Sequence, residues 1–189
     1  MKIIKQNSLG AIFIGAALGF SISSYSDSPP EIDASAGHVS VVHEGEGVMF
    51  ETGPGGRIKV WEKVPASATG GAFEVIIEEH FAGFGGAPRN VHRHPESSET
   101  FYVIRGDYIW RLGDEVIEAG PGDFVHVPAE THHSLHTDTG GAVVMVYTPP
   151  GIVAKQEAMK ALTPEQRGDR AIMRELNEKH GHVNVPNAE

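Results

Sequence analysis

The chain carries, at residues 92–99, the stretch His92-Arg93-His94-Pro95-Glu96-Ser97-Ser98-Glu99. Side chains alternate between the two faces of a β-strand, so His92 and His94 are expected to point to the same side. A bend at Pro95 would let the chain enter an adjacent strand and bring Glu99 back to the same point. Two neutral imidazoles and one carboxylate are common ligands of a divalent metal. The stretch therefore predicts a metal site built on β-strands.

A fourth ligand is expected from a second segment, which reads Pro128-Ala129-Glu130-Thr131-His132-His133. Its two adjacent histidines, His132 and His133, are both candidates. On a strand they would point to opposite faces, because the side-chain period is two. The chain contains no cysteine, so any metal must be held by histidine and carboxylate groups.

Glycines at fixed distances flank the first segment. Five residues separate Gly86 from His92, and six separate Glu99 from Gly106. This spacing resembles the first motif of the cupin superfamily, G(x)5HxH(x)3–4E(x)6G, at every fixed position. The resemblance extends over residues 39–151 of the chain.

The second cupin motif reads G(x)5PxG(x)2H(x)3N, and the chain matches it at Gly122, Pro128 and His133. It departs from the motif at Glu130, where the pattern has glycine, and at Thr137, where it has asparagine. Glu130 is expected to alter the turn ahead of the histidine, because glycine relaxes the backbone at such a position. The resemblance favours His133 as the fourth ligand and leaves the preceding histidine as its competitor.

The resemblance implies an all-β double-stranded β-helix, the jelly-roll barrel of cupins, with a C-terminal helical tail. Residues 148–151 (Thr-Pro-Pro-Gly) stand where small cupins related to quercetin dioxygenase pass from the barrel into such a tail. Because one motif pair is present, we expect a single-domain cupin with its barrel over residues 38–151 and a helical extension over residues 152–189. Similar cupins usually form homodimers, and a homodimer is expected here.

The resemblance also implies a function. One divalent transition metal (Fe, Mn, Ni, Co, Cu or Zn) would be held by His92, His94, Glu99 and His133. Its open coordination positions would bind a flavonol or other enol-type small molecule directly, as in a quercetinase-like dioxygenase. Glu99 would act both as a metal ligand and as the catalytic proton acceptor. The alternatives are a non-oxidative metal-dependent enzyme (an isomerase, lyase or decarboxylase) and a cupin that binds a small molecule without turnover.

The composition restricts the possible partners. The chain has 189 residues, enough for one domain with a core, and a formal net charge of −10. Residues 1–26 contain two lysines and no acidic residue, so the 13 basic and 25 acidic residues of the remainder give −12. This acidic body argues against binding to nucleic acid or to an anionic membrane.

The N-terminal residues have the pattern of a targeting segment. Two lysines precede an apolar run over residues 9–20, and small residues lead up to Ser26. The run is shorter than the roughly 20 residues that a membrane span needs. We therefore expect residues 1–26 to be a signal peptide and residues 27–37 a linker, with export to the periplasm or beyond and no stable membrane association after cleavage. A retained N-terminal anchor is the alternative.

Short segments of alternating character, separated by turns, predict the strands of a sandwich or barrel. These segments are residues 38–42, 57–62, 72–81, 100–105, 107–112, 115–119, 124–127, 134–137 and 142–148. The two strands on either side of Gly106 predict a hairpin. Residues 152–161 are expected to be helical, and Thr163 and Pro164 to begin a second helix that continues to about Lys179.

Some side chains have more than one interpretation. Phe101 and Val103 share the face of Glu99, so they are expected to line the cavity or to fill the core. His126 is interpreted as a core histidine bonded to a neighbour. His182 is interpreted as a solvated histidine near the end of a helix.

Overall fold

The computed structural model describes residues 41–85 and 91–185. The predicted signal peptide and linker, the beginning of the predicted strand over residues 38–42, and the motif glycine Gly86 therefore lie outside the described residues. Within the described ranges, no helix has both the length and the apolar character needed to cross a membrane.

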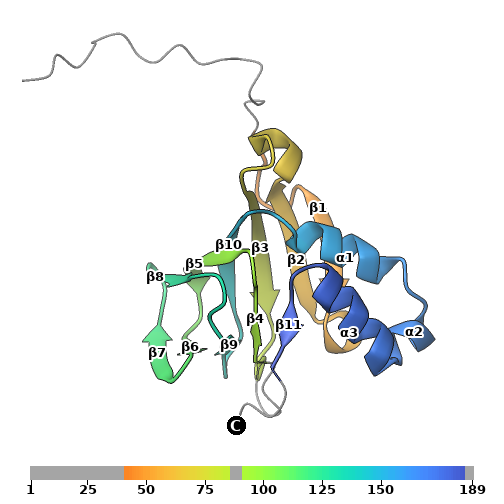
Figure 1. Ribbon diagram of the computed structural model, residues 1–189. Coiled ribbons are helices and arrows are strands. Elements are labelled where there is room, and N and C mark those ends of the chain that lie inside the picture. Colours follow the sequence, from red (N-terminus) through yellow and green to blue (C-terminus); the bar gives the residue numbers. More distant parts are fainter. Residues whose placement is uncertain (1–40, 86–90, 186–189) are drawn as a thin grey trace, which may run out of the picture. The chain divides into compact units, whose positions relative to one another are not determined.

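The described strands form two antiparallel sheets (Figure 1). The larger sheet contains, in spatial order, β1 (Val48–Thr52), β2 (Ile58–Val64), β3 (Glu74–His80), β10 (Gly141–Thr148), β5 (Ser98–Arg105) and β8 (Phe124–Val127). The smaller sheet contains β11 (Val183–Asn184), β4 (His92–Arg93), β9 (His133–His136), β6 (Tyr108–Leu112) and β7 (Glu115–Ala119). The predicted all-β jelly-roll class is confirmed.

An apolar core joins the inner faces of the two sheets. Alternation along β5 buries Phe101 and Val103 on the same face as Glu99, as predicted. From the smaller sheet, the buried Trp110 of β6 meets Phe101 edge to face, with ring centroids 5.7 Å apart. Glu99 is thus a charged side chain in a row that is otherwise apolar, which sets it apart from a packing residue.

Three helices follow β10, namely α1 (Ile152–Lys160), α2 (Pro164–Gly168) and α3 (Arg170–Lys179). They lie together beside β1 and β2 (Figure 1), and α1 contacts β1 directly. The buried carboxylate of Glu74 on β3 anchors the start of α1, since it accepts hydrogen bonds from the N–H groups of Gly151 (2.8 Å) and Ile152. A carboxylate at this end of a helix also complements the helix dipole. After α3 the chain returns to the smaller sheet as β11, which pairs with β4.

The predicted hairpin around Gly106 is wrong. β5 pairs with β10 and β8 in the larger sheet, whereas β6 pairs with β7 and β9 in the smaller one. The chain therefore crosses from one sheet to the other at Gly106, which has a φ of +84°. A Cβ atom at this glycine would lie 2.3 Å from the carbonyl oxygen of Gly140, so the crossing requires glycine for space as well as for conformation.

The C-terminal helices begin as predicted but do not continue as one helix. Thr163 caps the start of α2 as predicted, and it forms a capping box with Gln166. However, α2 ends at Gly168, and Asp169 starts a new helix by accepting hydrogen bonds from the N–H groups of Ala171 and Ile172. The single helix to Lys179 is therefore two helices, because an internal aspartate acts as a second N-cap.

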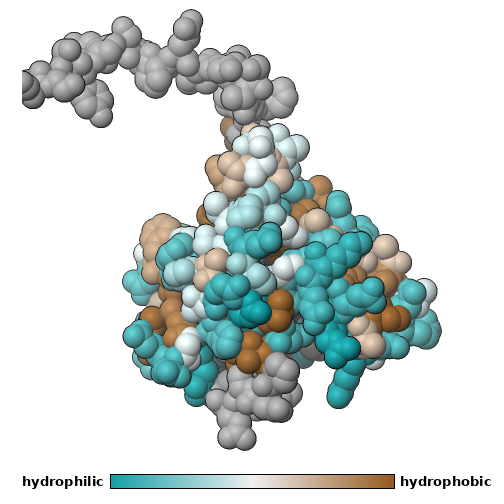
Figure 2. All heavy atoms as spheres, viewed as in Figure 1, coloured by the Kyte–Doolittle hydropathy of each residue, from teal (hydrophilic) through white to brown (hydrophobic). Residues whose placement is uncertain are grey.

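Two further predictions at the surface are wrong. Val41 and Val42 lie outside any strand, and the first described strand begins at Val48. His126 is exposed and bonds to the hydroxyl of Thr100 (2.9 Å), so it is not a core residue. On the face shown in Figure 2, hydrophilic residues separate several smaller hydrophobic areas.

Candidate metal centre

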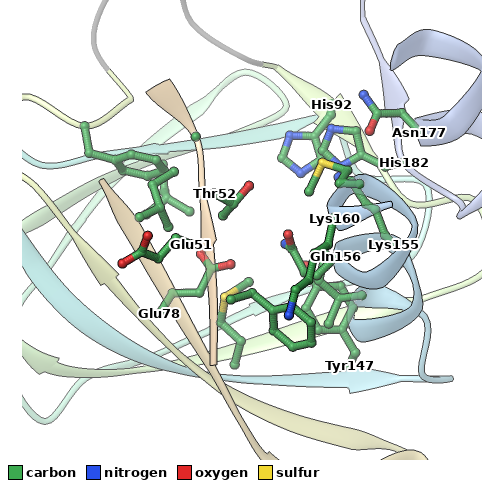
Figure 3. A pocket seen from close by; sticks show the side chains of 18 of the residues that line it. Glu51, Thr52, Glu78, His92, Tyr147, Lys155, Gln156, Lys160, Asn177 and His182 are labelled. Atoms are coloured by element: carbon green, nitrogen blue, oxygen red, sulfur yellow. The ribbon is translucent and has the colours of Figure 1, made fainter. Parts of the chain in front are cut away.

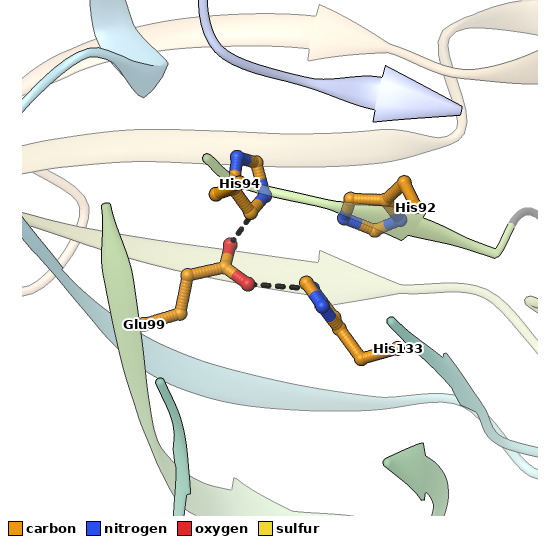
Figure 4. A group of neighbouring side chains, drawn as sticks. All are labelled: His92, His94, Glu99 and His133. Carbon is orange, nitrogen blue, oxygen red and sulfur yellow. Dashed lines mark ion pairs between the residues drawn. The ribbon is translucent and has the colours of Figure 1, made fainter. Parts of the chain in front are cut away.

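Four side chains meet between the two sheets (Figure 4). His92 comes from β4 and His94 from the residue after it, while β5 supplies Glu99 and β9 supplies His133. One potential ligand atom from each of the four lies within 4.8 Å of the others. The competing candidate, His132, is exposed and is not part of this cluster. The structure thus brings together the four side chains that the two motifs select.

Strand pairing sets the positions of these side chains. His92 and His133 are opposite each other in the pairing of β4 with β9, and their ring centroids are 4.2 Å apart. Glu99 approaches from the other sheet, where it lies opposite Tyr147 of β10. The cluster therefore joins the two sheets at one point of the barrel interior.

Glu99 lies between two of the imidazoles. Its Oε1 is 3.3 Å from Nε2 of His94, and its Oε2 is 2.7 Å from Nε2 of His133. All three residues are buried, yet among the described residues these two nitrogens and Oε2 have no hydrogen-bond partner of good geometry. Buried polar atoms nearly always have partners. Three such atoms facing one point fit a bound cation.

Backbone carbonyls determine which ring nitrogens face the cluster. Nδ1–H of His94 donates to the carbonyl of Gly181 at 2.8 Å, and Nδ1–H of His133 donates to the carbonyl of Thr131 at 2.9 Å. A carbonyl only accepts hydrogen bonds, so Nδ1 carries the hydrogen in the neutral ring and Nε2 presents its lone pair. Metal-binding histidines are oriented in this way in most proteins.

Electrostatics keep Glu99 ionised. Burial alone would raise the pKa of Glu99, but the contacts with His133 and His94 outweigh burial and hold the pKa well below 4.5. Burial lowers the pKa of His133, and the Glu99 carboxylate reverses this, so the net pKa lies above 6.5. A cation that binds here therefore competes with protonation of His133.

The turn ahead of β9 accommodates Glu130 at the position where the cupin motif has glycine. Glu130 has a φ of +65°, and it is the one non-glycine residue of the described ranges with a positive φ. It is the second central residue of a turn in which Thr131 N–H donates to the carbonyl of Pro128 at 3.3 Å. Its N–H donates to the carbonyl of His94 (2.8 Å), and its carboxylate pairs with Arg93. The turn keeps its shape, and Glu130 adopts a strained backbone that glycine would adopt freely.

The C-terminal tail contributes a buried histidine that the sequence analysis missed. His182 is 6% exposed, and its ring stacks on that of His92 with centroids 4.0 Å apart and an interplanar angle of 16°. Burial, with the nearby charge of Lys155 adding to it, lowers the pKa of His182 far below 6.5, so the ring is neutral. The interpretation of His182 as a solvated residue is wrong, because the pairing of β11 with β4 carries this segment inside.

A cavity of about 810 Å³ adjoins the cluster (Figure 3). His92, Glu99 and His133 line it on one side, and helix α1 contributes Lys155 and Gln156 on another. This volume is in the usual range for small-molecule sites.

Tyr147 also lines the cavity, next to Glu99. Burial, followed by the charge of Glu99, raises the pKa of the Tyr147 hydroxyl well above 10. The hydroxyl therefore stays protonated and available as a hydrogen-bond donor beside the carboxylate.

Comparison with known sequences identifies the family. The model of the family described as Cupin domain matches residues 82–149. Quercetin 2,3-dioxygenase of Bacillus subtilis (strain 168) is 33% identical over 110 residues, which are 55% of this chain and 32% of that protein. The chain thus spans about a third of the length of this relative.

The fold is shared with a solved structure of low sequence identity. KdgF from Halomonas sp. has a TM-score of 0.52 and 18% identity, over 61% of this chain and 99% of KdgF. An RmlC-like cupin from Shewanella frigidimarina NCIMB 400 has a TM-score of 0.49 and 19% identity, over 59% of this chain and 93% of that chain. Residues 82–149 thus form a cupin domain, with His92, Glu99 and His133 on the strands of the two antiparallel sheets.

Proposed function

We propose that this cupin is an exported metal-dependent enzyme that binds an enol-type small molecule, such as a flavonol, at a divalent metal. The metal would be held by His92, His94, Glu99 and His133. The observation that carries this proposal is the meeting of four potential ligand atoms, one from each of these side chains, within 4.8 Å of one another, with His94, Glu99 and His133 buried.

The donor set suits several metals. Three imidazoles and one carboxylate are acceptable ligands for Fe, Mn, Ni, Co, Cu and Zn. When bound, such a dication supplies a Lewis-acidic centre that attracts an enolate or catecholate oxygen and leaves positions open for a second small ligand. The single negative charge of Glu99 leaves the occupied cluster with a net positive charge.

The side chains around the cluster have defined tasks in this proposal. Glu99 is ionised and is the carboxylate placed to accept the proton that the hydroxyl of the small molecule releases. Tyr147, protonated over the whole physiological range, donates a hydrogen bond beside it. Apolar side chains such as Phe101, Leu135 and Met145 line the cavity and exclude water from the reacting group.

The reaction class follows from the relative with a known activity. The 33% identity to quercetin 2,3-dioxygenase of Bacillus subtilis, over 110 residues, supports oxidative cleavage of an enol-type molecule. Because a cupin barrel can carry many chemistries, this assignment depends on the cluster and the relative together.

An oxygen electrode tests the proposal. The full chain, loaded in turn with each of the six metals, is assayed for oxygen uptake with quercetin and with simple catechols. Uptake is expected with at least one redox-active metal, and it should be lost in the double variant His92→Ala, His94→Ala and kept in His132→Ala, which changes an exposed histidine outside the cluster. Bound metal without oxygen uptake for any of these compounds would reject the dioxygenase and leave a metal-binding cupin.

Export rests on the pattern of residues 1–26, two early lysines followed by an apolar run and small residues. Expression of the full chain in a Gram-negative host and mass measurement of the protein from the periplasm test it. A mature chain that begins near Asp27 is expected. A protein that keeps residue 1 and stays inside the cell would contradict export.

A further inference from the structure

Lys155 is the buried group of the cavity that the proposed function leaves unused. It lies on α1, is 8% exposed, and lines the cavity together with Glu99. Figure 3 shows it in this cavity with Tyr147. Burial lowers the pKa of Lys155 to about 8, and the charges of Glu78 and Glu99 oppose this fall. The amine is therefore mostly protonated at pH 7.

The ammonium group of Lys155 has no direct counter-charge among the described residues. No hydrogen bond or ion pair of ordinary length joins it to a described side chain, and the two nearest carboxylates are engaged elsewhere. Glu78 bonds to Nε2 of His80 at 3.1 Å, and Glu99 contacts His94 and His133. A buried charge without a close partner is costly, so a cation left in this state inside a cavity suits an anion brought by a ligand.

The walls of the same cavity combine charged and polar side chains with adaptable apolar ones. The chain has five methionines, and the four that follow Met1 all line this cavity, at positions 49, 145, 159 and 173. Methionine side chains are flexible and polarizable, and they pack well against flat or irregular apolar groups. Phe50, Phe84 and Phe101 add aromatic surface to the lining.

We propose that the natural ligand is an organic acid with an apolar, aromatic-sized body, whose carboxylate pairs with Nζ of Lys155 while an oxygen group at its other end lies at the metal cluster. This inference deepens the proposed function, on which it rests, by naming the class of molecule that the site takes. The neutral residues Gln156 and Asn177, which also line the cavity, are placed to hydrogen-bond polar groups of that body.

Binding of 2-naphthoate and of its neutral amide, 2-naphthamide, tests the inference. The two probes have nearly the same shape and differ in the charge. Isothermal titration is carried out on the full chain, both loaded with metal and stripped of it. Binding of the naphthoate carboxylate to the metal would otherwise give the same preference as its binding to Lys155. The variants are Lys155→Met and, as a charge-matched control, Lys179→Met, which changes an exposed lysine outside the cavity.

In the stripped parent, naphthoate is expected to bind roughly 10- to 100-fold more tightly than naphthamide, the value of a charge-assisted hydrogen bond in a partly buried site. Lys155→Met should abolish this preference and change the affinity for naphthamide little, while Lys179→Met should behave like the parent. Equal binding of the two probes by the parent would overturn the inference, even if Lys155→Met failed to fold.

A naphthoate preference that persists in Lys155→Met would also overturn the inference, since the carboxylate would then bind elsewhere. A naphthoate preference seen only in metal-loaded protein would likewise overturn the inference, because the carboxylate would then bind the metal. The metal content of each sample, measured in parallel, keeps the two proposals apart. A parent that holds no metal would remove the proposed function and leave the naphthoate result to decide the role of Lys155.

Discussion

Ending the chain after His180 is expected to weaken metal binding by roughly 20- to 1,000-fold, although it removes none of the four clustered side chains. The deleted residues include Gly181, whose carbonyl accepts the Nδ1–H of His94 at 2.8 Å, and His182, whose ring stacks on His92. They also include β11, which pairs with β4 through the partners Val183–Arg93 and Asn184–His92. Two of the three clustered imidazoles thus depend on the tail for their orientation.

The magnitude follows from what the tail does for His94. Without the Gly181 carbonyl, the ring is free to rotate and to carry its hydrogen on Nε2, the nitrogen that faces the cluster. Loss of such a partner typically lowers metal affinity 10- to 100-fold, which corresponds to about 1.4–2.7 kcal/mol. Loss of the His182–His92 stack would add about 0.5–1.5 kcal/mol of ring-ring contact.

The assay is a competition titration with Zn²⁺ and a chromophoric chelator. The control is the chain ended after Val185, which keeps β11 and both contacts. The full-length variant His182→Ala removes only the stack, so its affinity should lie between those of the two truncated chains. Circular dichroism checks that each barrel is folded. If the chain ended after His180 bound Zn²⁺ within twofold of the control, the tail would have no part in orienting the ligands, and the reasoning would be refuted.

Three other predictions concern stability and are measured by urea unfolding followed by tryptophan fluorescence. Glu130→Gly is expected to be about 1 kcal/mol more stable than Glu130→Ala, because both lose the ion pair but only glycine adopts a φ of +65° without strain; equal stability would contradict the strain. Glu74→Ala should lower the free energy of unfolding by about 1–3 kcal/mol, because the N–H groups of Gly151 and Ile152 lose a buried acceptor. A change in this free energy smaller than the experimental error would show that Glu74 does not anchor α1. The pKa of Lys155 falls from 10.5 to about 8 on folding, so between these pH values the unfolded chain binds more protons and stability should rise with pH. Between these pH values, the free energy of unfolding of the parent should rise by about 3 kcal/mol relative to that of Lys155→Met. If the difference in free energy of unfolding between the two proteins did not change with pH, the burial of the charge would be contradicted.

Features of the fold that depend on local pattern could be predicted from the sequence. Alternation along residues 98–105 identified the buried face of β5, and Thr163 with Pro164 identified the start of α2. Pairing between strands could not be predicted in the same way. A glycine such as Gly106 has a positive φ both in a hairpin turn and at a crossing between sheets, and only the long-range pairing of β5 with β10 distinguishes the two.

In the candidate metal site, too, the residues set by local pattern could be predicted and the long-range contacts could not. His92, His94, Glu99 and His133 have fixed spacings on strands whose alternation is local, and the structure brings these four side chains together. His182 and the other contributions of the C-terminal segment follow no motif. They reach the cavity because the helices pack beside β1 and the chain then returns to pair with β4, and neither contact leaves a periodic signal in the sequence.

The central claim is that the four clustered side chains hold a metal ion. Elemental analysis of the purified full chain, beside the double variant His92→Ala, His94→Ala and the control His132→Ala, tests it most directly. The account predicts about one equivalent of a divalent transition metal per chain in the parent and in the control, and almost none in the double variant, whose apolar core should keep the barrel folded. Equal metal in all three proteins, or no metal in the parent even after reconstitution, would contradict the claim.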